Sequence, residues 1–206
     1  MSLIHNHSEE CVKTEMKTEL DLFTVPYTQT SIEKSTFVEI PPVSAITDTG
    51  PLEFYISSSG EDYLDLNNTY LYTRVRIVNH DGTNLANDAV MGFINYPGCT
   101  LFSQVDIMLG DRLITQSSNT YPYHGIIECL INYGKHTLDT QFSPGLFCKD
   151  TSGHMDSLAI DGDNEGLVER ASHTVTSRIV ELIAPVHSDL FFQDCYKIVD
   201  KWLMFL

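Results

Sequence analysis

The stretch TYLYTRVRIV, residues 69–78, alternates between two kinds of side chain with a period of two. Leucine, threonine, valine and isoleucine occupy the odd positions 71–77, whereas tyrosine and arginine occupy the even positions 70–76. Because successive side chains of a β-strand point to opposite faces, this alternation predicts a half-buried strand.

Other strand-like runs are separated by clusters of glycine, proline, asparagine and serine, which favour turns. These runs cover residues 35–40, 52–56, 101–115, 175–186, 188–194 and 195–199. The run 101–115 contains Gly110-Asp111, which suits a two-residue turn and predicts a hairpin. Long, irregular connections favour a sandwich over a barrel of even hairpins. We therefore expect an all-β, antiparallel sandwich.

Residues 118–135, SNTYPYHGIIECLINYGK, depart from the strand pattern. The apolar residues at helical spacing are Tyr123, Ile127, Leu130 and Ile131. Pro122 suits the first helical turn, Asn119 or Thr120 can cap it, and Gly134 suits the C-terminal end. We predict one amphipathic helix inserted between strands, and a second short helix within 164–172.

The size and composition of the chain fit one globular domain. Its 206 residues are enough for a single β-sandwich, and ten tyrosines and ten phenylalanines favour pleated, half-buried surfaces. We expect residues 1–20, which contain the echo KTEM-KTEL, to form a flexible arm, and residues 21–206 to form the domain.

The charge balance excludes one class of partner. Acidic residues number 28 against 12 basic ones, which gives a formal net charge of −16. Proteins that bind nucleic acid use lysine and arginine to neutralise phosphates, so we expect no direct contact with nucleic acid. No apolar run reaches the roughly 18 residues that span a bilayer, and the start MSLIHNHSEE lacks the apolar core of a secretion signal. We expect an intracellular protein.

The five cysteines are dispersed, without a C-x-x-C pair, as is typical of reduced thiols in an intracellular protein. They are Cys11, Cys99, Cys129, Cys148 and Cys195. We interpret Cys129, on the predicted helix, as a small core residue.

The sharpest catalytic alternative is an aspartic peptidase, because Asp48-Thr49-Gly50 matches the signature triplet of that class. The segment IMLGD, residues 107–111, resembles the apolar segment that packs under the catalytic turn of retroviral peptidases. Against this, Pro51 follows the triplet and restricts Gly50 to extended conformations. No glycine-rich flap lies between the two motifs. We therefore interpret the triplet as a turn, since aspartate and glycine favour turns and Pro51 begins the next strand.

An acidic loop raises the question of a calcium site. In DGDNEGLVERAS, residues 161–172, Asp161, Asp163 and Glu165 stand at positions one, three and five, with Gly166 at six. A calcium loop needs a bidentate glutamate at position twelve, where this chain has Ser172. We expect an acidic surface loop. The eight histidines show no zinc-binding spacing, so we predict no metal, cofactor or catalytic residue.

The even positions of residues 70–76 carry two tyrosines and two arginines, a composition that is enriched at binding hot spots. They form either a recognition face or the ordinary solvent face of a strand. A carbohydrate-binding module using Tyr70 and Tyr72 is a further alternative. The last residues, KWLMFL, are apolar, which predicts contact with another subunit or further chain beyond them.

Several long runs resemble the major capsid protein of Maverick/Polinton elements and related adintoviruses. These runs are DLFTVPYTQTSIE (21–33), TDTGPLEF (47–54), SGEDYLDLNNTYLY (59–72), LFSQVDIMLGDRLIT (101–115), SNTYPYHGIIECLINYG (118–134), KDTSGHMD (149–156) and SDLFFQD (188–194). The Asp-Thr-Gly triplet falls inside one of them. The resemblance therefore implies a structural role for the triplet.

The resemblance implies a double jelly-roll subunit of which this chain carries the first jelly roll, with the second missing. It implies a structural role without enzyme activity or cofactor, in homotrimers that meet neighbouring capsomers in an icosahedral shell. Penton and minor capsid proteins would be further partners, and the location would be the virion. The prediction is thus a truncated capsid subunit, with the aspartic peptidase as the alternative function.

Overall fold

The computed structural model describes residues 32–43, 45, 50–57, 63–87, 89, 91–115, 118–159, 162–192 and 201–205. The chain divides into two compact units, Met1–Glu39 and Ile40–Leu206. The described part of the first unit, residues 32–39, forms neither helix nor strand, so the strand predicted at 35–40 is not formed. The predicted arm, residues 1–20, lies outside the described residues.

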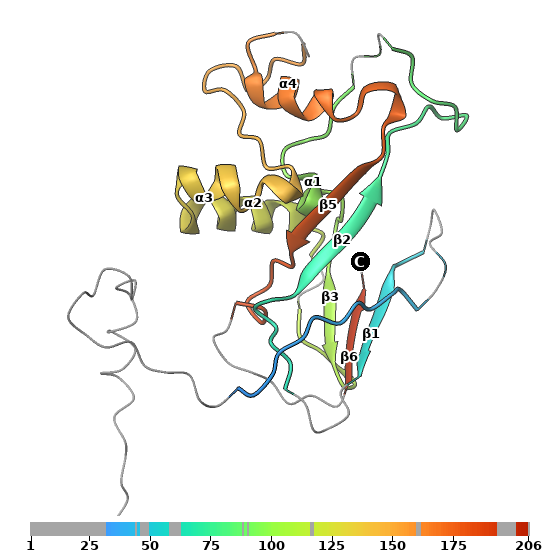
Figure 1. Cartoon of the computed structure of the whole chain (residues 1–206), viewed down its shortest axis with the longest axis vertical. Coiled ribbons are helices and arrows are strands. Elements are labelled where there is room, and N and C mark those ends of the chain that lie inside the picture. The colour runs from blue at the N-terminus through green and yellow to red at the C-terminus, as the bar shows by residue number, and fades with distance from the viewer. Residues whose placement is uncertain are drawn as a thin grey trace, which may run out of the picture. The chain divides into compact units, whose positions relative to one another are not determined.

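The prediction of an all-β jelly-roll sandwich is wrong. The described residues of the second unit contain four α-helices and two small antiparallel sheets (Figure 1). Strands do not form at residues 35–40 or 188–192, and the prediction missed the short helices at Pro97–Thr100 and Lys135–Thr140. Their periodicity is too brief to be recognised, because each spans at most two or so helical turns.

The larger sheet has four strands in the order β1-β6-β3-β4, and its described pairings are all antiparallel. The strands are β1 (Glu53–Ser57), β3 (Asp106–Leu109), β4 (Arg112–Leu113) and β6 (Lys201–Phe205). Strands β3 and β4 form the predicted hairpin, and Gly110 takes a φ of 59° at the turn.

The apolar stretch near residue 206 lies inside this sheet. Strand β6 pairs with β1 on one side and with β3 on the other, so that Met204 is opposite both Phe54 and Ile107. Met204 and Ile107 are both buried. Pairing within the chain therefore accounts for residues that we expected to contact another subunit.

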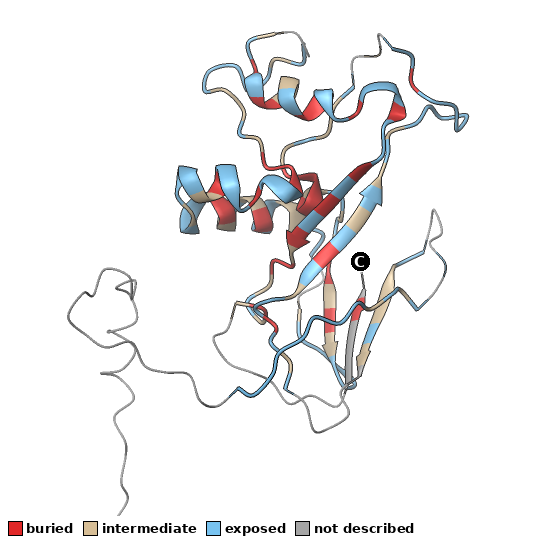
Figure 2. Ribbon diagram, in the orientation of Figure 1, coloured by how far each residue is buried: buried red, intermediate tan, exposed pale blue. Residues whose placement is uncertain are grey.

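The smaller sheet pairs β2 (Tyr70–Val75) with β5 (Val180–Pro185). The predicted alternation is confirmed: Leu71 is buried, whereas Tyr70, Tyr72 and Arg74 are exposed. Strand β5 alternates in the same way, as its red and blue segments show in Figure 2. The sheet thus has one buried face and one solvent face.

The described residues outside the two sheets form four α-helices and two 3₁₀ turns. They are α1 (Pro97–Thr100), α2 (Tyr121–Asn132), α3 (Lys135–Thr140) and α4 (Glu165–Ser172), with 3₁₀ turns η3 (Ser143–Gly145) and η4 (Val175–Ser177). Helix α1 and turn η3 contact β5 directly. Small residues permit this approach, because a Cβ on Gly98 would lie 2.8 Å from the Cβ of Ala184.

The predicted helices at 118–135 and 164–172 are confirmed as α2 and α4. The run 188–194 is wrong as a strand, because its described part, residues 188–192, forms turns. The run 195–199 lies outside the described residues. None of the described helices is both long and apolar enough to cross a bilayer.

Candidate functional site on helix α2

Helix α2 presents two chemically different sides, and the buried side carries a chain of hydrogen bonds. The side chain of His187 is fully buried at the end of β5, with Glu128 of α2 on one side of the ring. Its Nδ1 lies 2.9 Å from Glu128 Oε2, and its Nε2 lies 2.9 Å from the hydroxyl oxygen of Tyr96. His124 approaches the same Glu128 oxygen at 3.8 Å. Three segments far apart in sequence are thereby joined.

The protonation of Tyr96 follows from its surroundings. Burial raises the pKa of this phenol far above its ordinary value, so the hydroxyl keeps its proton. Its O–H therefore donates to Nε2 of His187, and the Nδ1–H of the same ring donates to Glu128. The backbone N–H of His187 donates to the Tyr121 hydroxyl at 3.1 Å. The buried polar groups of this network satisfy one another.

Two thiols adjoin the network. Cys129 Sγ lies 3.8 Å from His187 Nε2, and Cys99 packs so closely on α2 that a Cβ at Gly125 would lie 2.3 Å from its sulfur. Both cysteines have no exposed surface, which confirms Cys129 as a core residue. Burial raises the pKa of each thiol to about 12.

Cys129, His187 and Glu128 have the connectivity of a cysteine–histidine–acid triad. The chemistry of such a triad needs a thiolate that a substrate can reach. Here the thiol keeps its proton at neutral pH, and both the thiol and the His187 ring lie inside the core. The arrangement therefore fixes α2 against Tyr96 and against the segment that follows β5, and its thiol and imidazole are not offered to solvent.

The opposite side of α2 is apolar and exposed. The exposed fractions are 71% for Tyr123, 54% for Ile127, 49% for Leu130 and 76% for Ile131. We call these four residues the α2 face. The sequence pattern identified this stripe correctly, but such a stripe ordinarily faces the core. In this chain Gly125, Glu128 and Cys129 take the inward side instead.

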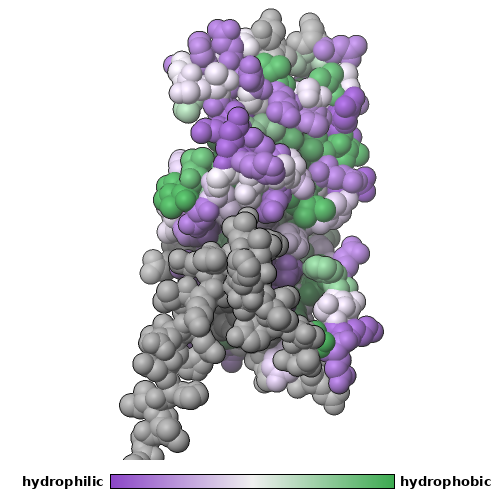
Figure 3. Space-filling view, turned by 60° about the vertical axis from the view of Figure 1, so that its left-hand side comes forward, coloured by the Kyte–Doolittle hydropathy of each residue, from purple (hydrophilic) through white to green (hydrophobic). Residues whose placement is uncertain are grey.

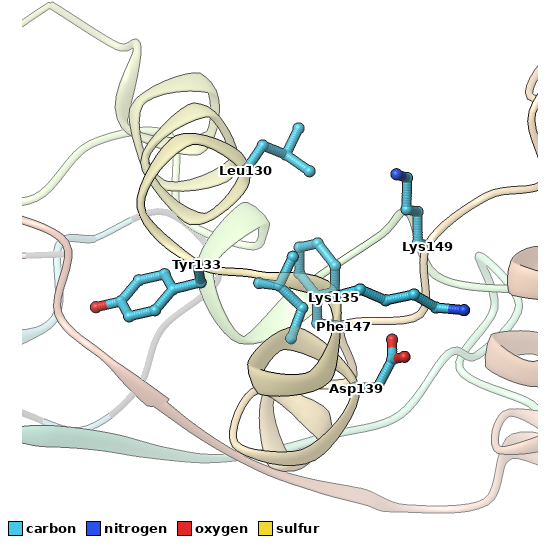
Figure 4. A pocket seen from close by; sticks show the side chains of 7 residues that line it. Leu130, Tyr133, Lys135, Asp139, Phe147 and Lys149 are labelled. Carbon is cyan, nitrogen blue, oxygen red and sulfur yellow. The ribbon is translucent and has the colours of Figure 1, made fainter. Parts of the chain in front are cut away.

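A shallow hollow of about 120 Å³ adjoins the α2 face (Figure 4). It is lined by Leu130, Tyr133, Lys135, Leu138, Asp139, Phe147 and Lys149. Figure 4 shows the amines of Lys135 and Lys149 on the same side of the hollow, with Asp139 below them. Small-molecule sites usually have about 300–1,000 Å³, so the hollow has the size for one side chain of a partner.

A second buried charge has a structural role that the sequence did not reveal. Arg170 of α4 donates from Nε to the Phe93 carbonyl at 2.9 Å and from a terminal nitrogen to the Cys148 carbonyl. Its other terminal nitrogen lies 2.6 Å from Asp150. The side chain is only 3% exposed, so its donors serve the fold. A lone arginine in a short helix carries no sequence signal of such a role.

The acidic loop leads into helix α4 and supplies its N-cap residue, Asn164. Asn164 is buried, and its side-chain oxygen accepts from the backbone N–H groups of Thr151 and Leu167. Glu165 is the first residue of α4, and Asp163 lies 3.7 Å from His154. Asp161 lies outside the described residues. Within the described part, no three histidine, cysteine or acidic side chains are arranged to hold a metal ion.

The peptidase triplet stays a prediction, because Asp48 and Thr49 lie outside the described residues. Its proposed companion, IMLGD, forms β3 and the hairpin turn. Among the other cysteines, Cys148 is half-buried and forms no disulfide, whereas Cys11 and Cys195 are outside the described residues.

Comparison with known proteins gives one weak relationship. The chain is 27% identical over 137 residues to an uncharacterized protein of Caenorhabditis elegans. The match covers 63% of this chain and 33% of that protein, so the chain corresponds to about a third of the relative's length. No family model matches the chain. No solved structure matches it either.

Proposed function

We propose that the chain is a structural subunit of a protein assembly, in which the α2 face contacts a neighbouring subunit. The observation that supports this proposal is the exposure of an apolar helix face whose opposite side is fixed in the core. Contiguous apolar surface of this kind marks interaction sites. In Figure 3, which turns the side of Figure 1 carrying α2 and α3 toward the viewer, apolar groups appear at the surface among hydrophilic ones.

Burial of the α2 face provides enough free energy for a weak contact between two copies. Many such contacts in one assembly would strengthen it. Complete burial of one aliphatic side chain contributes about 1.5–3 kcal/mol. Ile127, Leu130 and Ile131, at their present exposure, would together contribute on the order of 4 kcal/mol. Association costs of comparable size oppose this gain, so a single contact is transient and an assembly with many copies is stable.

The negative charge of the chain also favours the α2 face as the place of contact between copies. Copies with a net charge of −16 repel one another unless the contact is apolar or locally complementary. The α2 face is apolar, and Lys135 and Lys149 stand beside it at the hollow. Carboxylates of an acidic neighbour would find two cations there.

A capsid is the assembly that the resemblance to Maverick/Polinton major capsid proteins favours. In that setting the chain would be a shell component of trimers that meet neighbouring capsomers. The jelly-roll architecture that the resemblance also implied is not part of this proposal. The capsid proposal is supported by the long sequence runs, together with the surface chemistry of α2.

Sedimentation velocity over a range of protein concentrations tests the proposal. The full chain should form oligomers as its concentration rises. The double substitution Ile127→Glu and Ile131→Glu should leave it monomeric over the same range, because each carboxylate would have to be desolvated in the contact. A wild-type chain that is monomeric throughout would refute the proposal.

A matched substitution separates surface charge from position. Leu158 is 81% exposed and lies outside α2. Leu158→Glu adds one negative charge, whereas the double variant adds two. The single variant Ile127→Glu also adds one charge, so Leu158→Glu is compared directly with Ile127→Glu. If Leu158→Glu weakens association as much as Ile127→Glu does, then general repulsion explains the result and the α2 face is not the contact.

A further inference from the structure

The outer face of the β2–β5 sheet carries a second surface, separate from the α2 face. In the observed register Tyr72 is opposite Ile183, and Arg74 is opposite Glu181. Tyr70, Tyr72 and Ile183 are each about half exposed, at 52%, 51% and 46%. This face therefore presents two aromatic rings and an aliphatic side chain to solvent.

Basic side chains gather at one end of this face. Arg76 is exposed, and Arg74 forms a solvent-exposed ion pair of 3.2 Å with Glu181. Among the described residues, no ion pair is found for Arg76. A chain with only 12 lysines and arginines thus places two of its arginines side by side at this end of the sheet.

An open hollow lies within this basic end. It has a volume of about 290 Å³ and is lined by Arg74, Val75, Arg76 and Ile179. Its walls combine aliphatic groups with guanidinium groups. A ligand that fits them has an apolar side chain beside a carboxylate.

We propose that the outer face of β2–β5 binds an acidic peptide segment of a partner protein, with an aromatic or aliphatic residue in the hollow. Guanidinium groups bind carboxylates through paired, charge-assisted hydrogen bonds, and tyrosine supplies apolar contact at low entropic cost. Tyrosine and arginine are also the residues enriched at binding hot spots. The inference is independent of the assembly proposed for α2.

The charge distribution favours a peptide over nucleic acid. A nucleic acid would meet a chain with a net charge of −16, and repulsion over its length would oppose the contact with two arginines. A short acidic peptide touches only the local basic end. Ile183 and Ile179 add apolar surface that a phosphate backbone does not use.

Fluorescence anisotropy with a labelled peptide of about ten residues that alternates glutamate and phenylalanine tests the proposal. The full chain should bind it, and Arg74→Glu together with Arg76→Glu should weaken binding by about tenfold or more. Tyr70→Ala should weaken it to a smaller extent. Arg112→Glu, at an exposed basic residue of β4, is the control and should leave binding unchanged.

Four outcomes would overturn the proposal. The first is an absence of binding, and the second is equal loss of affinity in the Arg112→Glu control. The third is binding of a thymidine oligonucleotide as tightly as the peptide, which would assign the face to nucleic acid. The fourth is loss of self-association in the double arginine variant, which would make a second copy the occupant. Ile127→Glu should still bind the peptide, so failure of the α2 proposal would be recognised separately.

Discussion

The hydroxyl group of Thr73 is buried on the inner face of β2 without a hydrogen-bond partner in the described part of the chain. A buried polar group that lacks a partner costs about 1–3 kcal/mol. Thr73→Val keeps the branched shape of the side chain and removes the hydroxyl. We expect the free energy of unfolding, measured by urea denaturation, to rise by about 1 kcal/mol.

Thr174 supplies the matched control. Its hydroxyl is also buried, but it donates to the carbonyls of Met91 and Ala171 at 2.7 and 2.9 Å. Thr174→Val should therefore lower the free energy of unfolding by about 1–2 kcal/mol. If Thr73→Val lowered the free energy of unfolding as much as Thr174→Val, then the Thr73 hydroxyl would not be the unpartnered group described.

The buried thiols make stability depend on pH. In the unfolded chain the thiols of Cys99 and Cys129 ionise near pH 9.0, whereas burial raises each pKa to about 12 in the folded chain. Between these values the unfolded chain binds fewer protons, so the free energy of unfolding falls as the pH rises. The expected loss is about 1 kcal/mol per thiol at pH 10.

Urea denaturation at pH 8, 9 and 10 measures this loss. Cys129→Ser removes one titrating group, so its free energy of unfolding should fall less steeply with pH, even if its stability at pH 8 is lower. A wild-type stability that stays constant from pH 8 to pH 10 would show that the thiols are not buried as described.

At the scale of elements, the contact between α1 and α2 depends on one glycine. A Cβ at Gly125 would lie 2.3 Å from Cys99 Sγ and 3.2 Å from the His187 ring. Overpacking of this kind typically costs about 1–3 kcal/mol. Gly125→Ala should lower the thermal midpoint of unfolding by several degrees, although alanine favours a helix.

Gly134 provides the comparison for this substitution. It precedes α3 with a negative φ, and a Cβ there would meet no atom within 4 Å. Gly134→Ala should leave the midpoint nearly unchanged. If Gly125→Ala unfolds at the same temperature as the wild type, the α1–α2 contact is looser than described.

Local patterns predicted the elements whose signals are contained in their own residues. The alternation at 69–78 identified β2, Gly110-Asp111 identified the β3–β4 hairpin, and helical spacing identified α2. Strand β6 was missed as a strand because its partners, β1 and β3, lie about a hundred or more residues away in the chain. The burial of Met204 between β1 and β3 follows from that pairing.

The orientation of α2 shows a further limit of local patterns. Its apolar stripe was predicted, but the side that faces the core is decided by His187 and Tyr96, which belong to other elements. The inward position of the partly buried Glu128 gave no sequence signal, since glutamate is ordinarily exposed. The candidate site was therefore predictable as a helix with an apolar face, and its exposure was not.

At the scale of the whole molecule, the chain combines a large negative charge with two surfaces of different chemistry. The α2 face is apolar with two lysines beside it, and the outer face of β2–β5 is aromatic with two arginines. Both lie in the unit Ile40–Leu206. Locally apolar or basic surface on an acidic protein directs association to those places and opposes it elsewhere.

Hydroxyl-radical footprinting of the full chain, at concentrations from dilute to assembled, tests the central claim most directly. Tyr123 on the α2 face should be oxidised readily in dilute solution, where it is 71% exposed, and several-fold more slowly in the assembled state. Met155, which is 59% exposed and outside α2, serves as the reference and should react equally throughout. Oxidation of Tyr123 that does not change with concentration would contradict a role for the α2 face in assembly.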